Sequence, residues 1–133
     1  MKILLLILMA VGTLVSNAQN SWTVQVGKKT VLKTDVEDTT KNRLTIAPNN
    51  RLPVTVTYNE PKRKDWARTL LVYDAADNEL LRKDVTAITL STIQLKNWSK
   101  KTKRLYVYTL PVSLNPSIAI RVRRVHLCTL VMK

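Results

Sequence analysis

The residues best suited to metal binding or nucleophilic catalysis lie near the end of the chain. His126 is the only histidine and Cys128 the only cysteine, and two positions apart on a regular strand they share one face. An imidazole and a thiolate suit a metal ion, but a site needs at least one further ligand. A Cys-His hydrolase needs its nucleophile exposed, usually on a sharp turn. The sequence indicates neither feature, and we expect Cys128 to be a small buried hydrophobic residue.

A second polar group gathers carboxylates between residues 74 and 79. Asp74, Asp77 and Glu79 lie close to Asn78, a composition that calcium loops share. The segment lacks the alternate spacing and the glycine of a calcium loop, and Asp and Asn are ordinary turn residues, so we expect a turn. We predict no metal site, no cofactor site and no catalytic residue, and we expect that the chain is not an enzyme. A small enzyme is the second alternative.

Positive charge is the feature in which the chain departs most from average composition. Its formal net charge is +13 at pH 7. Basic residues gather at three places in the sequence: Lys62, Arg63 and Lys64; Lys100, Lys101, Lys103 and Arg104; and Arg121, Arg123 and Arg124. One interpretation is a solvated surface whose lysines discourage aggregation of strand edges, and the other is a surface for an anionic partner.

Arg121, Arg123 and Arg124 are the predicted binding residues of such a surface. A bulge in a strand presents neighbouring side chains to the outside together, and guanidinium groups fit carboxylate, sulfate or phosphate better than ammonium groups do. The predicted function is an exported, non-enzymatic binding or accessory domain, whose partner is an anionic envelope glycan, a lipid headgroup or an acidic protein. The first alternative is a structural or interaction domain that pairs through its strand edges and has no small ligand.

The N-terminal residues predict export. Lys2 precedes an apolar run over residues 3–14, and Ser16, Asn17 and Ala18 form a small-x-small pattern suited to signal peptidase. The run is shorter than the roughly 20 residues that a membrane span needs. We therefore expect residues 1–18 to be a cleaved signal peptide. Residues 19–133 then form one secreted or periplasmic domain without a transmembrane segment, for which nucleic acid is a poor candidate partner.

The sequence predicts that the segments which carry these candidate residues are mainly β-strands. Val54, Val56 and Tyr58 alternate with threonines, the period of two of a half-buried strand. Residues 116–133 predict a long C-terminal strand with a bulge at the adjacent Arg123 and Arg124, where the apolar phase slips. In residues 85–95 the phase also shifts, and either a bulged strand or a short helix explains that shift.

Short strands at regular spacing, separated by turn residues, predict an all-β protein built as an antiparallel β-sandwich of about seven to nine strands. An Ile-x-Leu pattern, then a turn, then Leu105, Tyr106, Val107 and Tyr108 resemble the corner of immunoglobulin-like sandwiches, where a tyrosine bonds back to the preceding loop. The resemblance covers about twenty residues and lacks the cysteine pair of antibody domains. It implies an immunoglobulin-like style of fold and no function.

The exported protein should begin at Gln19. Because Ala18 completes the cleavage pattern, we expect mass spectrometry of the secreted protein to give the mass of residues 19–133, lowered by one ammonia if Gln19 cyclises to pyroglutamate. A mature species that keeps residues 1–18 would contradict export as a soluble domain.

Overall fold

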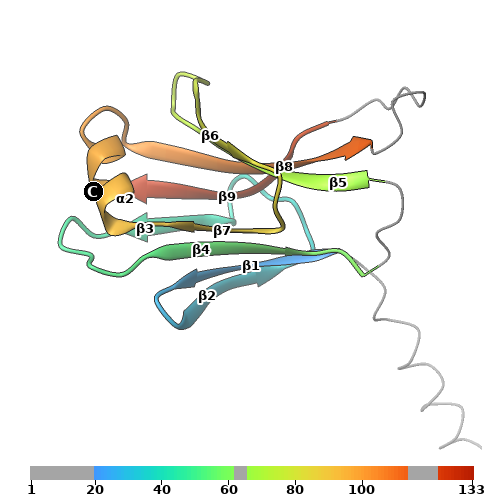
Figure 1. The fold of residues 1–133 in the computed structure, drawn as a ribbon. Helices are drawn as coiled ribbons and strands as arrows, with labels where there is room; N and C mark the ends of the chain where they lie inside the picture. Colours follow the sequence, from blue (N-terminus) through green and yellow to red (C-terminus); the bar gives the residue numbers. More distant parts are fainter. Residues whose placement is uncertain (1–19, 62–65, 114–122) are drawn as a thin grey trace, which may run out of the picture.

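The structure is a computed structural model that describes residues 20–61, 66–113 and 123–133. The signal peptide predicted at residues 1–18 lies outside this part of the chain. Within it there are nine strands and one short helix (Figure 1). Their bounds, in chain order, are β1 (Ser21–Val26), β2 (Lys29–Thr34), β3 (Arg43–Ile46), β4 (Val54–Asn59), β5 (Trp66–Tyr73), β6 (Glu79–Lys83), β7 (Ala87–Leu90), α2 (Thr92–Ser99), β8 (Arg104–Ser113) and β9 (Val125–Met132).

The strands form one sheet of four and one of five. The order is β2-β1-β4-β7 in the first sheet and β3-β9-β8-β5-β6 in the second. Paired strands are antiparallel, except that β3 runs parallel to β9. The two sheets lie as facing layers (Figure 1). The prediction of an all-β, sandwich-like fold is therefore confirmed.

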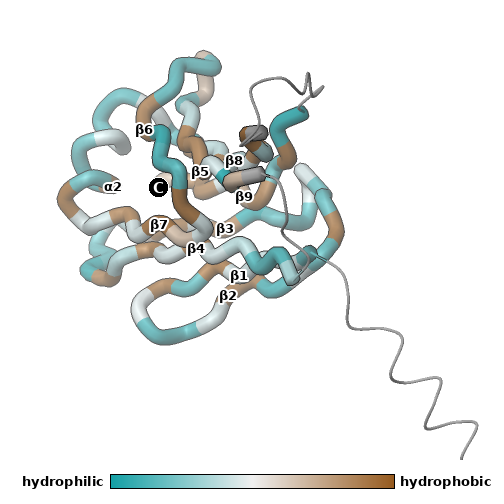
Figure 2. The backbone as a smooth tube through the Cα atoms, turned by 45° about the vertical axis from the view of Figure 1, so that its right-hand side comes forward, coloured by the Kyte–Doolittle hydropathy of each residue, from teal (hydrophilic) through white to brown (hydrophobic). Residues whose placement is uncertain are grey.

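The core lies between the sheets and follows the alternation in the sequence. In β4, Val54, Val56 and Tyr58 are buried while the threonines between them are partly exposed. β8 contributes Leu105 and Val107, which are fully buried. Because side chains alternate across a strand, each of these strands turns one apolar face toward the core. Apolar stretches recur along the strands of both sheets, and hydrophilic stretches prevail in the turns (Figure 2).

The start of the C-terminal strand differs from its prediction. β9 begins at Val125, so Arg123 and Arg124 precede it, and the bulge predicted at these two arginines is wrong. Residues 116–122, which the prediction included in the strand, lie outside the described part of the chain.

A bulge does occur in β9, closer to its middle. Cys128 pairs with Val107 of β8 and His126 pairs with Tyr108, so Leu127 is the extra residue between them. The extra residue shifts the phase of the strand. As a result both Leu127 and Cys128 belong to the core, while His126 lies on the same face as Tyr108.

A tryptophan from the other sheet satisfies the backbone at this bulge. The indole Nε1 of Trp22, in β1, donates a buried hydrogen bond of 2.9 Å to the carbonyl oxygen of Leu127. A bulged residue lacks its regular partner in the ladder, and a buried carbonyl without a partner is costly. The position of the bulge therefore depends on a contact between residues far apart in the sequence.

Residues 85–95 contain both a strand and the start of a helix. β7 ends at Leu90, and Ser91 then caps α2. The Ser91 hydroxyl accepts a 3.1 Å bond from the Gln94 amide, and the Gln94 side chain accepts a 3.0 Å bond from the Ser91 amide. This capping box was readable in the sequence as a serine followed three positions later by a glutamine. Leu95 is the buried residue of the helix.

A buried ion pair lies at the edge of the core. Arg68, on β5, donates bonds of 2.6 and 3.3 Å to the two carboxylate oxygens of Glu60, and the two side chains are only 6% and 4% exposed. The Arg68 guanidinium also lies 4.7 Å from the centre of the Tyr58 ring. Tyr58 in turn stacks on Trp22, with ring centres 5.9 Å apart. The charged pair, the two rings and the β9 bulge thus form one continuous network.

Removing one charge of the buried pair should destabilise the fold. We expect Glu60→Gln to lower the free energy of unfolding by about 3 kcal/mol, because the Arg68 guanidinium then stays buried without an opposite charge. Urea denaturation at pH 7 measures this loss. Glu79→Gln is the control, since it removes the carboxylate of the exposed Arg82–Glu79 pair and should leave the stability nearly unchanged. Equal losses in both variants would contradict a special role for the buried pair.

Candidate functional site

An open groove of about 720 Å³ lies at one end of the sandwich. One wall is the connection between β3 and β4, residues 47–53, and the other is α2, with the end of β9 between them. Apolar side chains of Ile46, Leu95 and Met132 contribute to the lining, and all three are nearly fully buried. Ile46 and Met132 are the last residues of β3 and β9, and Leu95 is the buried residue of α2, so the groove opens directly from the end of the core.

Four cationic residues line the groove: Arg51, Lys96, Lys100 and Lys133. No carboxylate side chain is among the lining residues. All four cationic residues are exposed, and within the described residues none of them forms an ion pair. We call this set of four residues the basic groove. No described carboxylate side chain pairs with these charges, so they are open to a ligand.

Helix α2 positions one side of the basic groove. Ile93, Lys96 and Lys100 are separated by three and four residues, the spacing that places side chains on one face of a helix. Leu95 points to the core instead and anchors the helix. The capping box fixes where the helix begins, and therefore which residues form each face.

Further cationic residues surround the basic groove. The β1–β2 turn reaches the same end, because the amide of Gly27 donates a 2.9 Å bond to the carbonyl of Pro53. The cationic residues of this end, all exposed, are Lys28, Lys29, Arg51, Lys96, Lys100, Lys101, Lys103 and Lys133. The segments that carry them, residues 27–29, 47–53, 92–103 and 133, contain no Asp or Glu. We call this set of eight residues the basic end.

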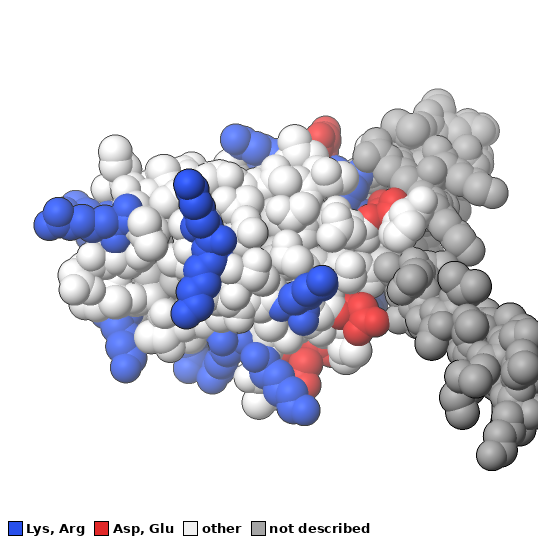
Figure 3. Space-filling model, turned by 90° about the horizontal axis from the view of Figure 1, so that it is seen from below, with Lys and Arg blue, Asp and Glu red and all other residues white. Residues whose placement is uncertain are grey.

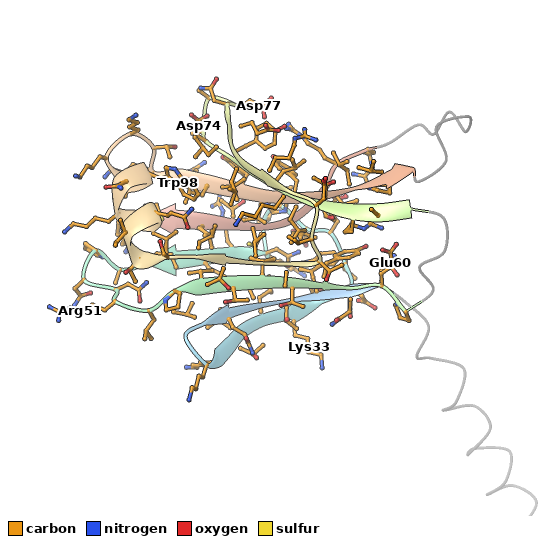
Figure 4. All side chains as sticks on the ribbon, in the orientation of Figure 1. Lys33, Arg51, Glu60, Asp74, Asp77 and Trp98 are labelled. Carbon is orange, nitrogen blue, oxygen red and sulfur yellow. The ribbon has the colours of Figure 1, made fainter. Side chains whose placement is uncertain are left out.

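No acidic residue that the structure describes belongs to the segments of the basic end. In Figure 4, Arg51 marks the tip of the basic end and Glu60 lies at the opposite end of the sandwich. Seen from below, the half of the molecule away from the grey residues shows only Lys and Arg among its charged side chains (Figure 3). Charge is therefore segregated along the sandwich. Segregation raises the local positive potential above what the net charge alone would give.

One acidic turn does approach the basic end, but its carboxylates are already bonded. Ala75, in the β5–β6 turn, donates to the hydroxyl of Thr102 at 3.2 Å. Asp74 accepts bonds from backbone amides of its own turn, that of Asn78 first among them, and these bonds lower the pKa of its carboxyl. Asp77, at a positive φ of 63°, pairs with Arg124. The predicted turn is thus confirmed, and neither of its aspartates lines the basic groove.

The arginines predicted from the sequence are not brought together. Arg121 lies outside the described residues. Arg123 forms a 2.9 Å ion pair with Glu37 of the β2–β3 connection, whereas Arg124 forms one of 2.9 Å with Asp77 of the β5–β6 turn. These two side chains therefore reach different segments, and each already has a carboxylate partner. That they bind an anion remains a prediction.

Arg124 also packs against aromatic rings. Its guanidinium carbon lies 4.7 Å from the centre of the Tyr73 ring and 4.3 Å from that of Tyr108. The hydrogen bond to Asp77 raises the pKa of Arg124. Tyr108 and Tyr106 contact each other, with ring centres 6.4 Å apart. Within the described residues neither hydroxyl bonds to the loop before β8, so the tyrosine contact that the immunoglobulin resemblance implies is not formed there.

His126 and Cys128 do not share a face, because the bulge separates them. Cys128 is buried in the core as predicted, and burial raises the pKa of its thiol to about 12. His126 bonds Thr129 through Nε2 at 2.7 Å, and its Nδ1 is buried without a partner among the described residues. The part of the chain that the structure describes holds no group of three or more His, Cys, Asp or Glu residues arranged for a metal ion.

Stability should fall as the pH drops below the usual pKa of His126. Burial lowers the pKa of this imidazole from 6.5, while the nearby carboxylates of Glu37 and Asp38 raise it and only partly offset burial. The unfolded chain therefore binds a proton more readily than the folded protein, and stability decreases from pH 6.5 downward by at most about 1.4 kcal/mol per pH unit. Urea denaturation between pH 5 and 8, compared with His126→Gln, measures this dependence, and identical slopes in both proteins would contradict it.

Comparisons with known proteins add no relative: no family model, curated protein or solved structure matches the chain. Among the described residues, no helix has both the length and the apolar character needed to cross a membrane. What the protein does must therefore be argued from the geometry and charge of the site. The basic groove is the feature that carries this argument.

Proposed function

We propose that this chain is an exported, non-enzymatic binding domain that holds an anionic partner at the basic groove. The observation that carries the proposal is the set of four exposed cationic residues, without a side-chain carboxylate among the lining residues and without an ion pair in the described part of the chain. Four arginines outside the groove, by contrast, already form ion pairs with carboxylates of the protein: Arg68, Arg82, Arg123 and Arg124.

The composition of the groove favours a partner with several negative groups. A single anion near an exposed lysine gains little in water, because solvent and salt screen the attraction. Several cations around one concave surface with apolar walls reinforce one another and concentrate anions there. The mixture of one guanidinium fork, on Arg51, and three ammonium groups suits sulfate, phosphate or carboxylate groups on a larger partner.

The predicted export limits which partners the groove can meet. A secreted or periplasmic protein encounters envelope glycans, lipid headgroups and acidic proteins more readily than nucleic acid. The hydroxyl residues of the lining are Thr92 and Ser99, and the lining holds no histidine, aspartate or glutamate that could activate them as in a Ser-His-Asp triad. The Ser99 hydroxyl donates to the Lys96 carbonyl at 2.7 Å. Binding without catalysis is therefore the function that these side chains support best.

The strand order supports an immunoglobulin-like arrangement, which we include in the proposal. Strands β1, β4 and β7 correspond to A, B and E of such a sandwich, and β9, β8, β5 and β6 correspond to G, F, C and C′. Immunoglobulin-like domains cluster their loops at the two ends of the sandwich and commonly bind there. The basic groove lies at such an end, although this is an analogy of fold and not of function.

Neutralising the groove should weaken binding to a polyanion. We expect the variant Arg51→Gln/Lys96→Gln/Lys100→Gln to bind heparin at about 0.1 M salt at least tenfold more weakly than the unaltered protein, because three adjacent attractions are lost. The matched control Lys33→Gln/Lys41→Gln/Lys83→Gln removes the same charge from positions outside the groove and should lose much less affinity. Titration calorimetry measures both, and circular dichroism should show an unchanged fold.

Two outcomes would contradict the proposal. Equal losses in the two triple variants would show that heparin responds only to net charge. A larger loss in Arg121→Gln/Arg123→Gln than in the groove variant would place the binding surface at the arginines predicted from the sequence instead.

A further inference from the structure

We infer that the partner of the basic groove is the surface of an anionic phospholipid bilayer; this inference rests on the function proposed above. It starts from Ile93, which is 72% exposed and is the most exposed large hydrophobic residue of the described chain. Ile93 lines the groove, on the same helix face as Lys96 and Lys100. An isoleucine in that position faces water among cations unless a partner covers it.

A second apolar side chain projects at the same end. Leu52 follows Arg51 in the β3–β4 connection and is 51% exposed. It lies against the β1–β2 turn, where a Cβ atom at Gly27 would come within 3.2 Å of its side chain. The Asn50 side chain holds the backbone of Leu52 at both sides, donating to its carbonyl at 2.8 Å and accepting from its amide at 3.1 Å. Leu52 is therefore presented in a fixed position.

Apolar tips among cationic residues match the two layers of a bilayer surface. Isoleucine and leucine side chains gain by entering the boundary between headgroups and acyl chains. Lysine and arginine gain at the headgroup level, where anionic lipids hold their phosphates, and long basic side chains can bury their stems while keeping the charge in the polar layer. The basic end supplies eight cationic residues for this layer and no acid in the same segments.

A glycan or an acidic protein fits the same surface less completely. An anionic glycan would engage the cations, but it would leave Ile93 in water. Sugar rings usually stack on aromatic faces, and none of the residues that line the groove is aromatic. Lipid headgroups attached to an apolar layer are the anionic partner that satisfies both the charges and the exposed isoleucine.

Vesicle binding tests this inference on the full mature protein. The probes are vesicles of phosphatidylcholine alone, vesicles with about one third phosphatidylglycerol, and soluble heparin. We expect the protein to sediment with the anionic vesicles and to remain in solution with the neutral ones. Ile93→Ser should lower the partition onto anionic vesicles about tenfold, a loss that heparin binding does not match.

Matched variants make the result specific. Val36→Ser removes an apolar side chain that is 61% exposed in the β2–β3 connection, and it should leave vesicle binding unchanged. Leu52→Ser is the second test at the basic end, should Ile93→Ser fail to fold, and we expect it to weaken vesicle binding as well.

The outcomes separate the two proposals. Binding to heparin without binding to anionic vesicles would overturn the bilayer inference and leave a glycan or an acidic protein as the partner. Vesicle binding that responds to Ile93→Ser and Leu52→Ser no more than to Val36→Ser would overturn it too, since attraction would then be electrostatic only. If the unaltered protein binds neither heparin nor anionic vesicles, the proposed function itself is overturned.

Discussion

The hydrogen bond between the Trp22 indole and the Leu127 carbonyl is the contact on which the arrangement of the sandwich depends. It joins β1 of one sheet to the bulge in β9 of the other, and it is buried. Without it the carbonyl would be unsatisfied, at a cost of about 1–3 kcal/mol. The bulge that it accompanies places Cys128 in the core and His126 on the opposite face, beside Tyr108. The bulge thus sets the orientation of His126 and Cys128, the pair that the sequence analysis weighed as an imidazole and a thiolate ligand.

The same tryptophan begins a network of contacts that ends at the buried ion pair. Trp22 stacks on Tyr58, Tyr58 lies beneath the Arg68 guanidinium, and Arg68 pairs with Glu60. Arg68 and Glu60 use their charges on each other, and burial makes their pairing obligatory. At the other end the cations of the basic groove have no acid to pair with in their own segments. The described residues thus combine a buried, paired set of charges with an exposed set of cations that have no side-chain carboxylate partner.

Local contacts fix the backbone of the basic end. A capping box sets the start of α2, Leu95 anchors the helix in the core, and Asn50 braces the backbone of Leu52. Ordered backbone beneath exposed charged and apolar side chains reduces the entropy lost when a partner binds. The combination is expected of a binding surface, and it gives the proposed contact with an anionic bilayer a rigid platform rather than a flexible tail.

The sequence by itself determined the strand-rich fold, the turn at residues 74–78 and the burial of Cys128, because alternation and turn chemistry are local properties. It also contained the capping box at Ser91 and Gln94, a local signal that the interpretation missed. Only the tertiary structure decided where the β9 bulge lies, since Trp22 is 105 residues from Leu127. The same holds for the charges: Arg123 meets Glu37 across 86 residues, whereas Arg51, Lys96 and Lys133 meet no acid in the described chain. Distances between remote segments decide which cations have a carboxylate partner. The alternation of apolar and polar residues along the chain carries no information about those distances.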